Sequence, residues 1–293
     1  MIAQILNGLI VGSMYALIAI GFTLVLGVLD RLNFAHTEVF MFGAFAGLVA
    51  VDAGGVWWLA LPFAFVVGGV FGIAVEFISF RRFDGDARIT AALSSLAVGL
   101  VIVDVTQKVW GTEPVGMPIP GWVTTAGFEL FGMRVVYVQL LILGVTLALM
   151  AVLHALVSRT RMGRNIRAVA DSPDAASLLG VDVRRVTQHV FFVSSALAGV
   201  AGLLLAFRTG FANTDVGLTF GLKAIAIMAI GGMGDLRGAV VGGLLIGVLE
   251  ALTFQFGIGK LGELVVWITM ILVLFVRPEG LFGGGVHVKD VRA

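Results

Sequence analysis

Nine apolar stretches, each about as long as a membrane-spanning helix, dominate the sequence. An α-helix needs about 20 mostly apolar residues to cross the hydrocarbon core of a bilayer. The seventh and eighth stretches contain Gly231-Gly232-Met233-Gly234 and Gly242-Gly243, so we expect interruptions there, of the kind tolerated only where protein or a cavity covers the backbone. The stretches cover residues 4–29, 37–53, 57–79, 89–109, 135–157, 186–207, 217–232, 238–256 and 261–276. We predict an all-α integral membrane protein, a polytopic helical bundle of about eight to ten transmembrane helices.

The composition supports this class and argues against several others. Only 13% of the residues are charged, about half the share in a soluble domain. The net charge of +1 gives no basic face for nucleic acid. The chain has no cysteine and four scattered histidines, which argues against a metal site. No phosphate-binding loop or nucleophile elbow is visible. We therefore expect one membrane domain, 1–293, without enzymatic activity or a bound cofactor.

The basic residues between the stretches fall mostly on one side. Alternate connections hold fourteen of them: Arg31, Arg81, Arg82, Arg88, Arg159, Arg161, Arg164, Arg167, Arg184, Arg185, Arg237, Arg277, Lys289 and Arg292. The opposite connections hold three: Arg134, Arg208 and Lys260. Because basic loops stay in the cytoplasm, we predict a cytoplasmic C-terminus, an external N-terminus and an external 110–134 connection that forms a structured turn or an interfacial loop.

A weak internal repeat is a further interpretation of the glycine positions. Gly21, Gly43 and Gly47 recur as Gly221, Gly243 and Gly247, each at an offset of 200. Repeats are common in transporter folds. Among forty glycines, chance recurrence is an equal alternative.

The 158–185 connection contains a compact helix signal. Asp171 or Ser172 can cap the helix, Pro173 suits its first position, and Asp174 lies in the first turn, where the helix dipole favours a carboxylate. The predicted helix and its ends comprise Asp171, Ser172, Pro173, Asp174, Ala175, Ala176, Leu178, Leu179 and Gly180.

Two interpretations of this helix remain equal on the residues alone. It is either an ordinary loop helix packed on the bundle, or a docking element whose Leu178 and Leu179 enter a groove of a soluble partner.

Three polar residues, Asn33, His36 and Glu38, flank the start of the second stretch. We expect them near the cytoplasmic interface, close enough to be wet. We interpret them as a structural network that holds the first turn, with a gate as the alternative.

Four charged residues lie inside other stretches. Asp104 and Lys108 are four positions apart, so they share a helix face and can pair. Lys223 and Glu250 are predicted to bond each other or to bracket a cavity.

Four segments, in order along the chain, carry a family resemblance. They are Asn33-Phe34-Ala35-His36, the run 161–181, Gly231-Gly232-Met233-Gly234 with Gly238, and Arg277-Pro278-Glu279-Gly280-Leu281-Phe282. Together they resemble the permeases of branched-chain amino-acid ABC transporters, and the first segment favours the shorter of the two paralogous permeases. Thr37 departs from the family pattern, which has glycine there.

The resemblance implies a multi-pass permease of the bacterial inner membrane that forms an alternating-access path for leucine, isoleucine and valine. It implies a heterodimer with a second permease, two cytoplasmic ATPases that bind ATP and magnesium, and a periplasmic or lipid-anchored binding protein. The 171–180 helix would couple the ATPases to the membrane gate. Related permeases for urea, short amides or another small solute, and an ion-coupled secondary transporter, are the alternatives.

Overall fold

The structure is a computed structural model that describes residues 2–83, 88–130 and 133–283. Lys289 and Arg292, counted above among the basic residues, lie outside this part of the chain. The helices are α1 (Ile2–Leu29), α2 (His36–Asp52), α3 (Ala60–Val75), α4 (Arg88–Trp110), α5 (Gly121–Thr125), α6 (Tyr137–Arg159), α7 (Arg161–Asp171), α8 (Pro173–Leu178), α9 (Val183–Thr209), α10 (Val216–Gly231), α11 (Leu236–Gln255) and α12 (Gly262–Val276). A 3-10 turn (Trp57–Leu59) leads into α3, a π-helical turn (Glu76–Phe80) follows it, and a second 3-10 turn (Gly259–Leu261) precedes α12. The short strands are β1 (Val115–Gly116), β2 (Gly127–Leu130), β3 (Met133–Val136) and β4 (Phe211–Ala212).

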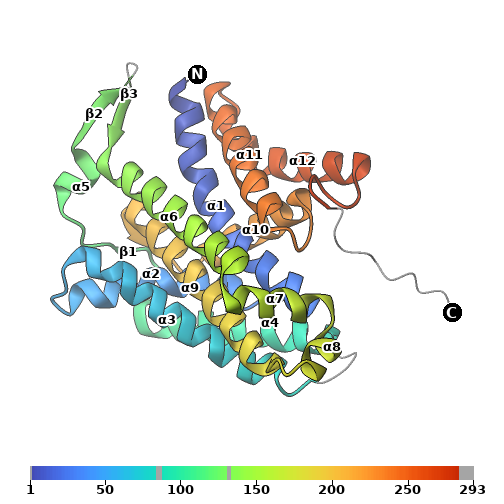
Figure 1. Cartoon of the computed structure of the whole chain (residues 1–293). Coiled ribbons are helices and arrows are strands. Elements are labelled where there is room, and N and C mark those ends of the chain that lie inside the picture. Colours follow the sequence, from blue (N-terminus) through green and yellow to red (C-terminus); the bar gives the residue numbers. More distant parts are fainter. Residues whose placement is uncertain (1, 84–87, 131–132, 284–293) are drawn as a thin grey trace.

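The prediction of an all-α membrane bundle is confirmed, because each of the nine apolar stretches forms a helix (Figure 1). Within the described residues, seven helical segments are long and apolar enough to cross a bilayer. The other two, α2 and α10, have 17 and 16 residues. The interruption expected at Gly242-Gly243 is absent, because α11 runs through both glycines. The one after α10 is present, since Gly232 adopts a φ of +109° and ends the helix.

The centre of the bundle is formed by α1 and α9, which run antiparallel. Their contact extends from Gly21 beside Ser194 at one end to Asn7 beside Arg208 at the other. Small residues let neighbouring backbones approach these two helices closely. A Cβ atom on Gly12 of α1, for example, would lie 2.7 Å from a backbone oxygen of α11.

Two groups of four membrane helices, α1–α4 and α9–α12, make matching contacts. Helix α1 packs on α10 and α11, as α9 packs on α2 and α3; α2 contacts α4, as α10 contacts α12. Since α1 and α9 are antiparallel, the groups form an inverted repeat of the kind found in transporters. The segment Phe34-Ala35-His36-Thr37-Glu38-Val39 correspondingly recurs as Phe211-Ala212-Asn213-Thr214-Asp215-Val216. The repeat in the structure therefore pairs α1–α4 with α9–α12 and does not follow the glycine offset of 200.

The connections gather at two ends of the bundle. At the basic end, Arg31 Nη1 donates to the carbonyl oxygen of Phe83 at 2.8 Å, and Leu281 N donates to that of Ile230 at 2.8 Å. At the opposite end, β1 pairs with β4, and β2 and β3 form a hairpin. The 110–134 connection is therefore structured over its described residues, as predicted. The charge bias assigns the basic end to the cytoplasm.

Candidate functional site

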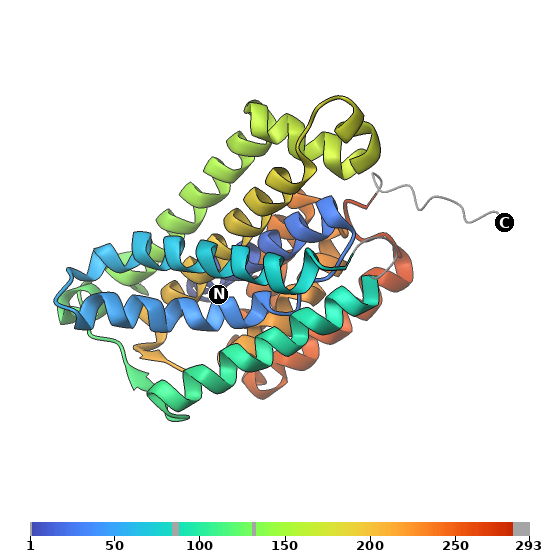
Figure 2. The same cartoon turned by 90° about the horizontal axis from the view of Figure 1, so that it is seen from below.

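The helices α7 and α8 connect α6 to α9 and lie at the edge of the bundle (Figure 2). The side chain of Thr160 caps α7 by accepting a hydrogen bond from Gly163 N at 3.0 Å. The inner face of α7 buries Ile166 and Val169. Sequence analysis missed this helix, although Thr160 and the three-residue apolar spacing both indicate it.

The predicted 171–180 helix is shorter than expected and needs one correction. Asp171 is the last residue of α7 and not a cap of the next helix. Ser172 provides that cap, since its Oγ accepts a hydrogen bond from Ala175 N at 3.3 Å. Pro173 and Asp174 occupy the first turn as predicted. Gly180 follows α8 with a φ of +83°, which suits glycine and stops the helix.

One side of α8 faces the protein and the other faces solvent. Ala176 is buried against the bundle, whereas Ala175 is exposed. Leu178 and Leu179 are 90% and 84% exposed, and among the large apolar side chains of the described residues only Phe275, at 88%, is comparably exposed. Two adjacent leucines in water favour a docking surface over a helix that only packs on its own chain.

Charged groups hold and surround this surface. A guanidinium nitrogen of Arg167 in α7 donates to the backbone oxygen of Val157 in α6. Asp182 caps α9 and pairs with Arg185 at 3.0 Å. Arg161 and Arg164 remain exposed on α7. This candidate docking surface, formed by α7 and α8, is therefore apolar at its tip, and charged side chains of both signs surround it.

Asn33, His36 and Glu38 do not lie at a wet interface, contrary to the prediction. Their exposed fractions are 1%, 0% and 9%. The connection after α1 folds back into the bundle before α2 begins, so His36 packs on Phe22 with ring centroids 4.5 Å apart. Helix α1 continues seven residues beyond Phe22, or about 10 Å. His36 is consequently buried well inside the bundle.

Glu38 lies on the side of α2 that faces α4 and α10. Its side chain contacts Gly99, at the midpoint of α4, and Gly217, in the first turn of α10. Thr37 Oγ1 donates to Glu38 Oε1 at 3.0 Å, whereas Glu38 Oε2 is buried without a hydrogen-bond partner in the described structure. No side-chain hydrogen bond joins Asn33, His36 and Glu38 in this part of the chain. The Thr37 departure is accommodated because its methyl group packs on Gly221.

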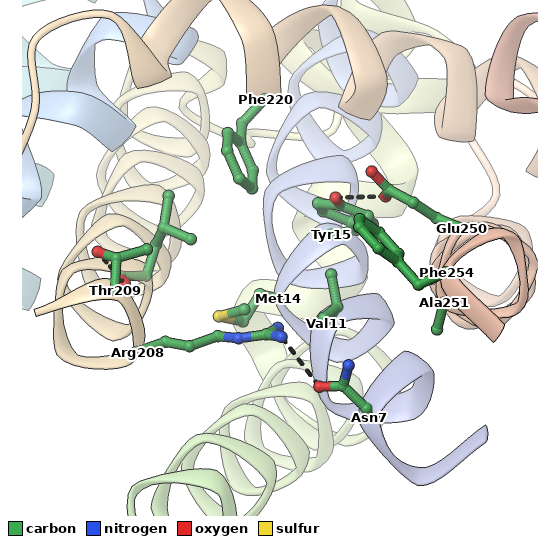
Figure 3. A pocket seen from close by; sticks show the side chains of 12 residues that line it. Asn7, Val11, Met14, Tyr15, Arg208, Thr209, Phe220, Glu250, Ala251 and Phe254 are labelled. Carbon is green, nitrogen blue, oxygen red and sulfur yellow. Dashed lines mark hydrogen bonds between the residues drawn. The ribbon is translucent and has the colours of Figure 1, made fainter. Parts of the chain in front are cut away.

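A second polar cluster joins α1, α10 and α11 (Figure 3). Lys223 Nζ pairs with Glu250 Oε1 at 2.8 Å, and the hydroxyl of Tyr15 donates to Glu250 Oε2 at 2.6 Å. Glu250 and Tyr15 also line a cavity of about 280 Å³, where Arg208 Nη2 donates to Asn7 Oδ1 at 2.9 Å. The predicted bond between Lys223 and Glu250 is therefore confirmed, whereas only Glu250 of the two lines the cavity. Sequence analysis missed Tyr15 and Asn7, because their partners lie more than 200 residues away.

A third charged pair lies on the surface of α4. Asp104 Oδ2 and Lys108 Nζ are 2.7 Å apart, as their spacing predicted. Their side chains are 63% and 74% exposed, although α4 is a candidate membrane span. Within the described residues, no group of three or more His, Cys, Asp or Glu side chains could hold a metal ion.

Comparison with known proteins identifies the family. Residues 4–274 match the model of the branched-chain amino acid transport system permease component. The chain is 33% identical over 291 residues to the high-affinity branched-chain amino acid transport system permease protein BraD of Pseudomonas aeruginosa, covering 96% of this chain and 95% of BraD. It is 33% identical over 294 residues to LivH of Escherichia coli K12, covering 96% and 94% of the two chains.

The chain is also similar to LivM of Escherichia coli K12, a second high-affinity branched-chain amino acid transport system permease protein. Identity is 26% over 292 residues, covering 91% of this chain and 67% of LivM. The greater similarity to LivH confirms the resemblance to the shorter permease. This multi-pass membrane protein, homologous to bacterial inner-membrane permeases, therefore belongs to the non-catalytic permease component family of branched-chain amino acid ABC transporters.

Proposed function

We propose that this chain is the permease subunit of a binding-protein-dependent ABC importer and forms an alternating-access path for leucine, isoleucine and valine. Transport along this path is driven by ATP hydrolysis in two separate cytoplasmic ATPases, which bind ATP and magnesium. A periplasmic or lipid-anchored protein delivers the amino acid. The observation that supports the proposal most directly is the exposed Leu178–Leu179 tip of the docking surface at the basic end.

The docking surface has the properties that energy coupling requires. Leu178 and Leu179 supply apolar area for a groove on the ATPase, and α7 and α8 connect that area to α6 and α9 through short, capped turns. Because α9 is central and antiparallel to α1, a displacement at the ATPase reaches the core of the bundle through one helix.

A second permease is the partner that we propose for the outer face of α4. Charged side chains at membrane depth rarely face lipid; they face protein or water. Asp104 and Lys108 are exposed on α4 in the single chain. A second, paralogous permease packed along α4, with water between the subunits, gives this pair a suitable environment. The similarity to both LivH and LivM is consistent with a heterodimer.

The decisive experiment is purification of the chain from its native membrane in mild detergent, with mass spectrometry of the co-purifying subunits. We expect a second permease and two ATPases. The assembly is placed in liposomes with its binding protein. It should transport leucine only when ATP is present on the side of the membrane that carries the ATPases. Uptake by this chain alone, driven by a proton or sodium gradient, would establish a secondary transporter instead. Import of urea or another solute in preference to leucine would keep the class and change the substrate.

A further inference from the structure

A cavity of about 410 Å³, here called the central groove, opens between α2, α4 and α10. The N-terminal ends of α2 and α10 form one side, with Glu38 and Asp215, and the middle of α4 forms the other, with Gly99 and Leu100. Glu38 and Asp215 occupy equivalent positions in the two copies of the inverted repeat. The groove therefore lies where the two halves of the fold meet.

Two carboxyl groups and no basic side chain line the groove. Glu38 and Asp215 are its two ionisable lining residues, and no Lys, Arg or His lines it. Glu38 Oε2 has no hydrogen-bond partner in the described structure, and neither carboxylate forms an ion pair there. The first turn of α10, at Gly217, contacts the Glu38 carboxylate and favours its negative charge, because helix N-termini attract anions.

The remaining lining suits an aliphatic group. Leu96, Leu100 and Leu218 line the groove, and 44%, 63% and 63% of their surfaces are exposed in the single chain. Leu96 and Leu100 continue along α4 to Asp104 and Lys108 at four-residue intervals, which places all four on one helix face. Thr214 and Thr219 add hydroxyl groups near Asp215. An unpaired carboxylate beside apolar walls matches a solute with one ammonium group and a branched hydrocarbon side chain.

We propose that Glu38, with Asp215, binds the ammonium group of the transported amino acid in the central groove; this inference rests on the proposed function. The carboxylates attract the ammonium group, and the leucines of α4 and α10 contact the aliphatic side chain. Binding is weak, because a permease that held its substrate tightly would release it slowly. The position of Glu38 beside the midpoint of α4 makes this site an intermediate stop between the two sides of the membrane.

The test uses the complete assembly in phosphatidylcholine nanodiscs. The chain has no native cysteine, so Leu100→Cys gives one thiol on this subunit, at the groove. Labelling of that thiol by a small methanethiosulfonate reagent is measured on this subunit with L-leucine, 3-methylbutylamine or 4-methylvalerate present. Leucine and the amine, which lacks the carboxylate, should slow labelling. The acid, which lacks the ammonium group, should not. Equal protection by the acid, or none by leucine, overturns the proposal.

Variants then identify the carboxylates. Glu38→Gln should raise the leucine concentration that gives half protection by about tenfold or more, because a charge-assisted contact is lost. Asp215→Asn should also raise the leucine concentration that gives half protection. Glu76→Gln is the matched control, since Glu76 is also buried with a free carboxylate oxygen but does not line the groove. Unchanged protection in both groove variants refutes the assignment.

Two other sources of a cation give different outcomes. If phosphatidylethanolamine added to the nanodiscs protects the thiol and leucine does not, the groove binds a lipid headgroup and the proposal is wrong. If Glu38→Gln instead releases the second permease without any effect of leucine, a basic side chain of that subunit is the partner, and the proposal is again wrong. ATP-driven leucine import is measured separately on the unmodified assembly. Failure of import with intact protection contradicts the proposed function and leaves the ammonium site standing.

Discussion

Replacement of Leu178 by arginine tests the docking surface with little effect on folding. Leu178 is 90% exposed and Leu179 is 84% exposed, so neither side chain contributes appreciably to the packing of this chain. Exposed substitutions of this kind change the free energy of unfolding by about 0.5 kcal/mol or less. Any larger effect on transport must therefore arise in a complex.

The expected loss of ATPase affinity follows from the leucine surface that the ATPase would cover. Burial of one exposed leucine side chain contributes about 1.5–3 kcal/mol, which corresponds to roughly a 10- to 150-fold change in affinity. A buried, unpaired arginine adds a desolvation cost to this loss. Leu178→Arg and Leu179→Arg should each weaken ATPase binding to the permease by at least about tenfold.

The assay is titration of the purified ATPase onto permease assemblies in nanodiscs, followed by ATP-driven leucine uptake in liposomes. Leu261→Arg is the control, because it makes the same substitution in the 3-10 turn at the external end. Thermal unfolding should be unchanged for all three variants. Wild-type ATPase affinity and transport in both the Leu178 and Leu179 variants would refute the docking interpretation.

Three further predictions concern stability in detergent, measured as thermal unfolding by intrinsic fluorescence. Lys223→Met leaves Glu250, whose side chain is 16% exposed, without its cation and should cost about 3 kcal/mol, the lower end for a buried pair; the double variant with Glu250→Leu should recover most of the loss, and no recovery would contradict a stabilising ion pair. Gly12→Ala should lower stability, since its Cβ would lie 2.7 Å from a backbone oxygen of α11; Gly144→Ala in α6, where a Cβ meets nothing within 4 Å, should leave stability unchanged or raise it slightly, because alanine favours a helix over glycine. Asp235→Ala removes the acceptor of two N-terminal amides of α11, at 2.7 and 3.1 Å, and should cost about 1 kcal/mol; an unchanged melting temperature would mean that the cap contributes nothing.

The inverted repeat shows where pattern and packing diverge. The glycine offset of 200 does not match the repeat, because glycine marks close helix contacts of many kinds. The helix contacts instead match the segment that begins at Phe34-Ala35 with the segment that begins at Phe211-Ala212. That similarity was present in the sequence, but only the antiparallel pairing of α1 with α9 identifies its meaning.

The sequence by itself determined the class of membrane protein, the nine helices that form from the apolar stretches, the basic end of the bundle and the short helix that begins at Pro173. These properties depend on local composition: the length of an apolar run, the charge of a loop, or the order of a cap, a proline and a glycine. The tertiary structure decided the depth of Glu38 and the partnership of Tyr15 with Glu250, which are 235 residues apart. Hydropathy along one chain gives no information about such contacts. They depend on which helices pack together and on how far a connection folds back into the membrane.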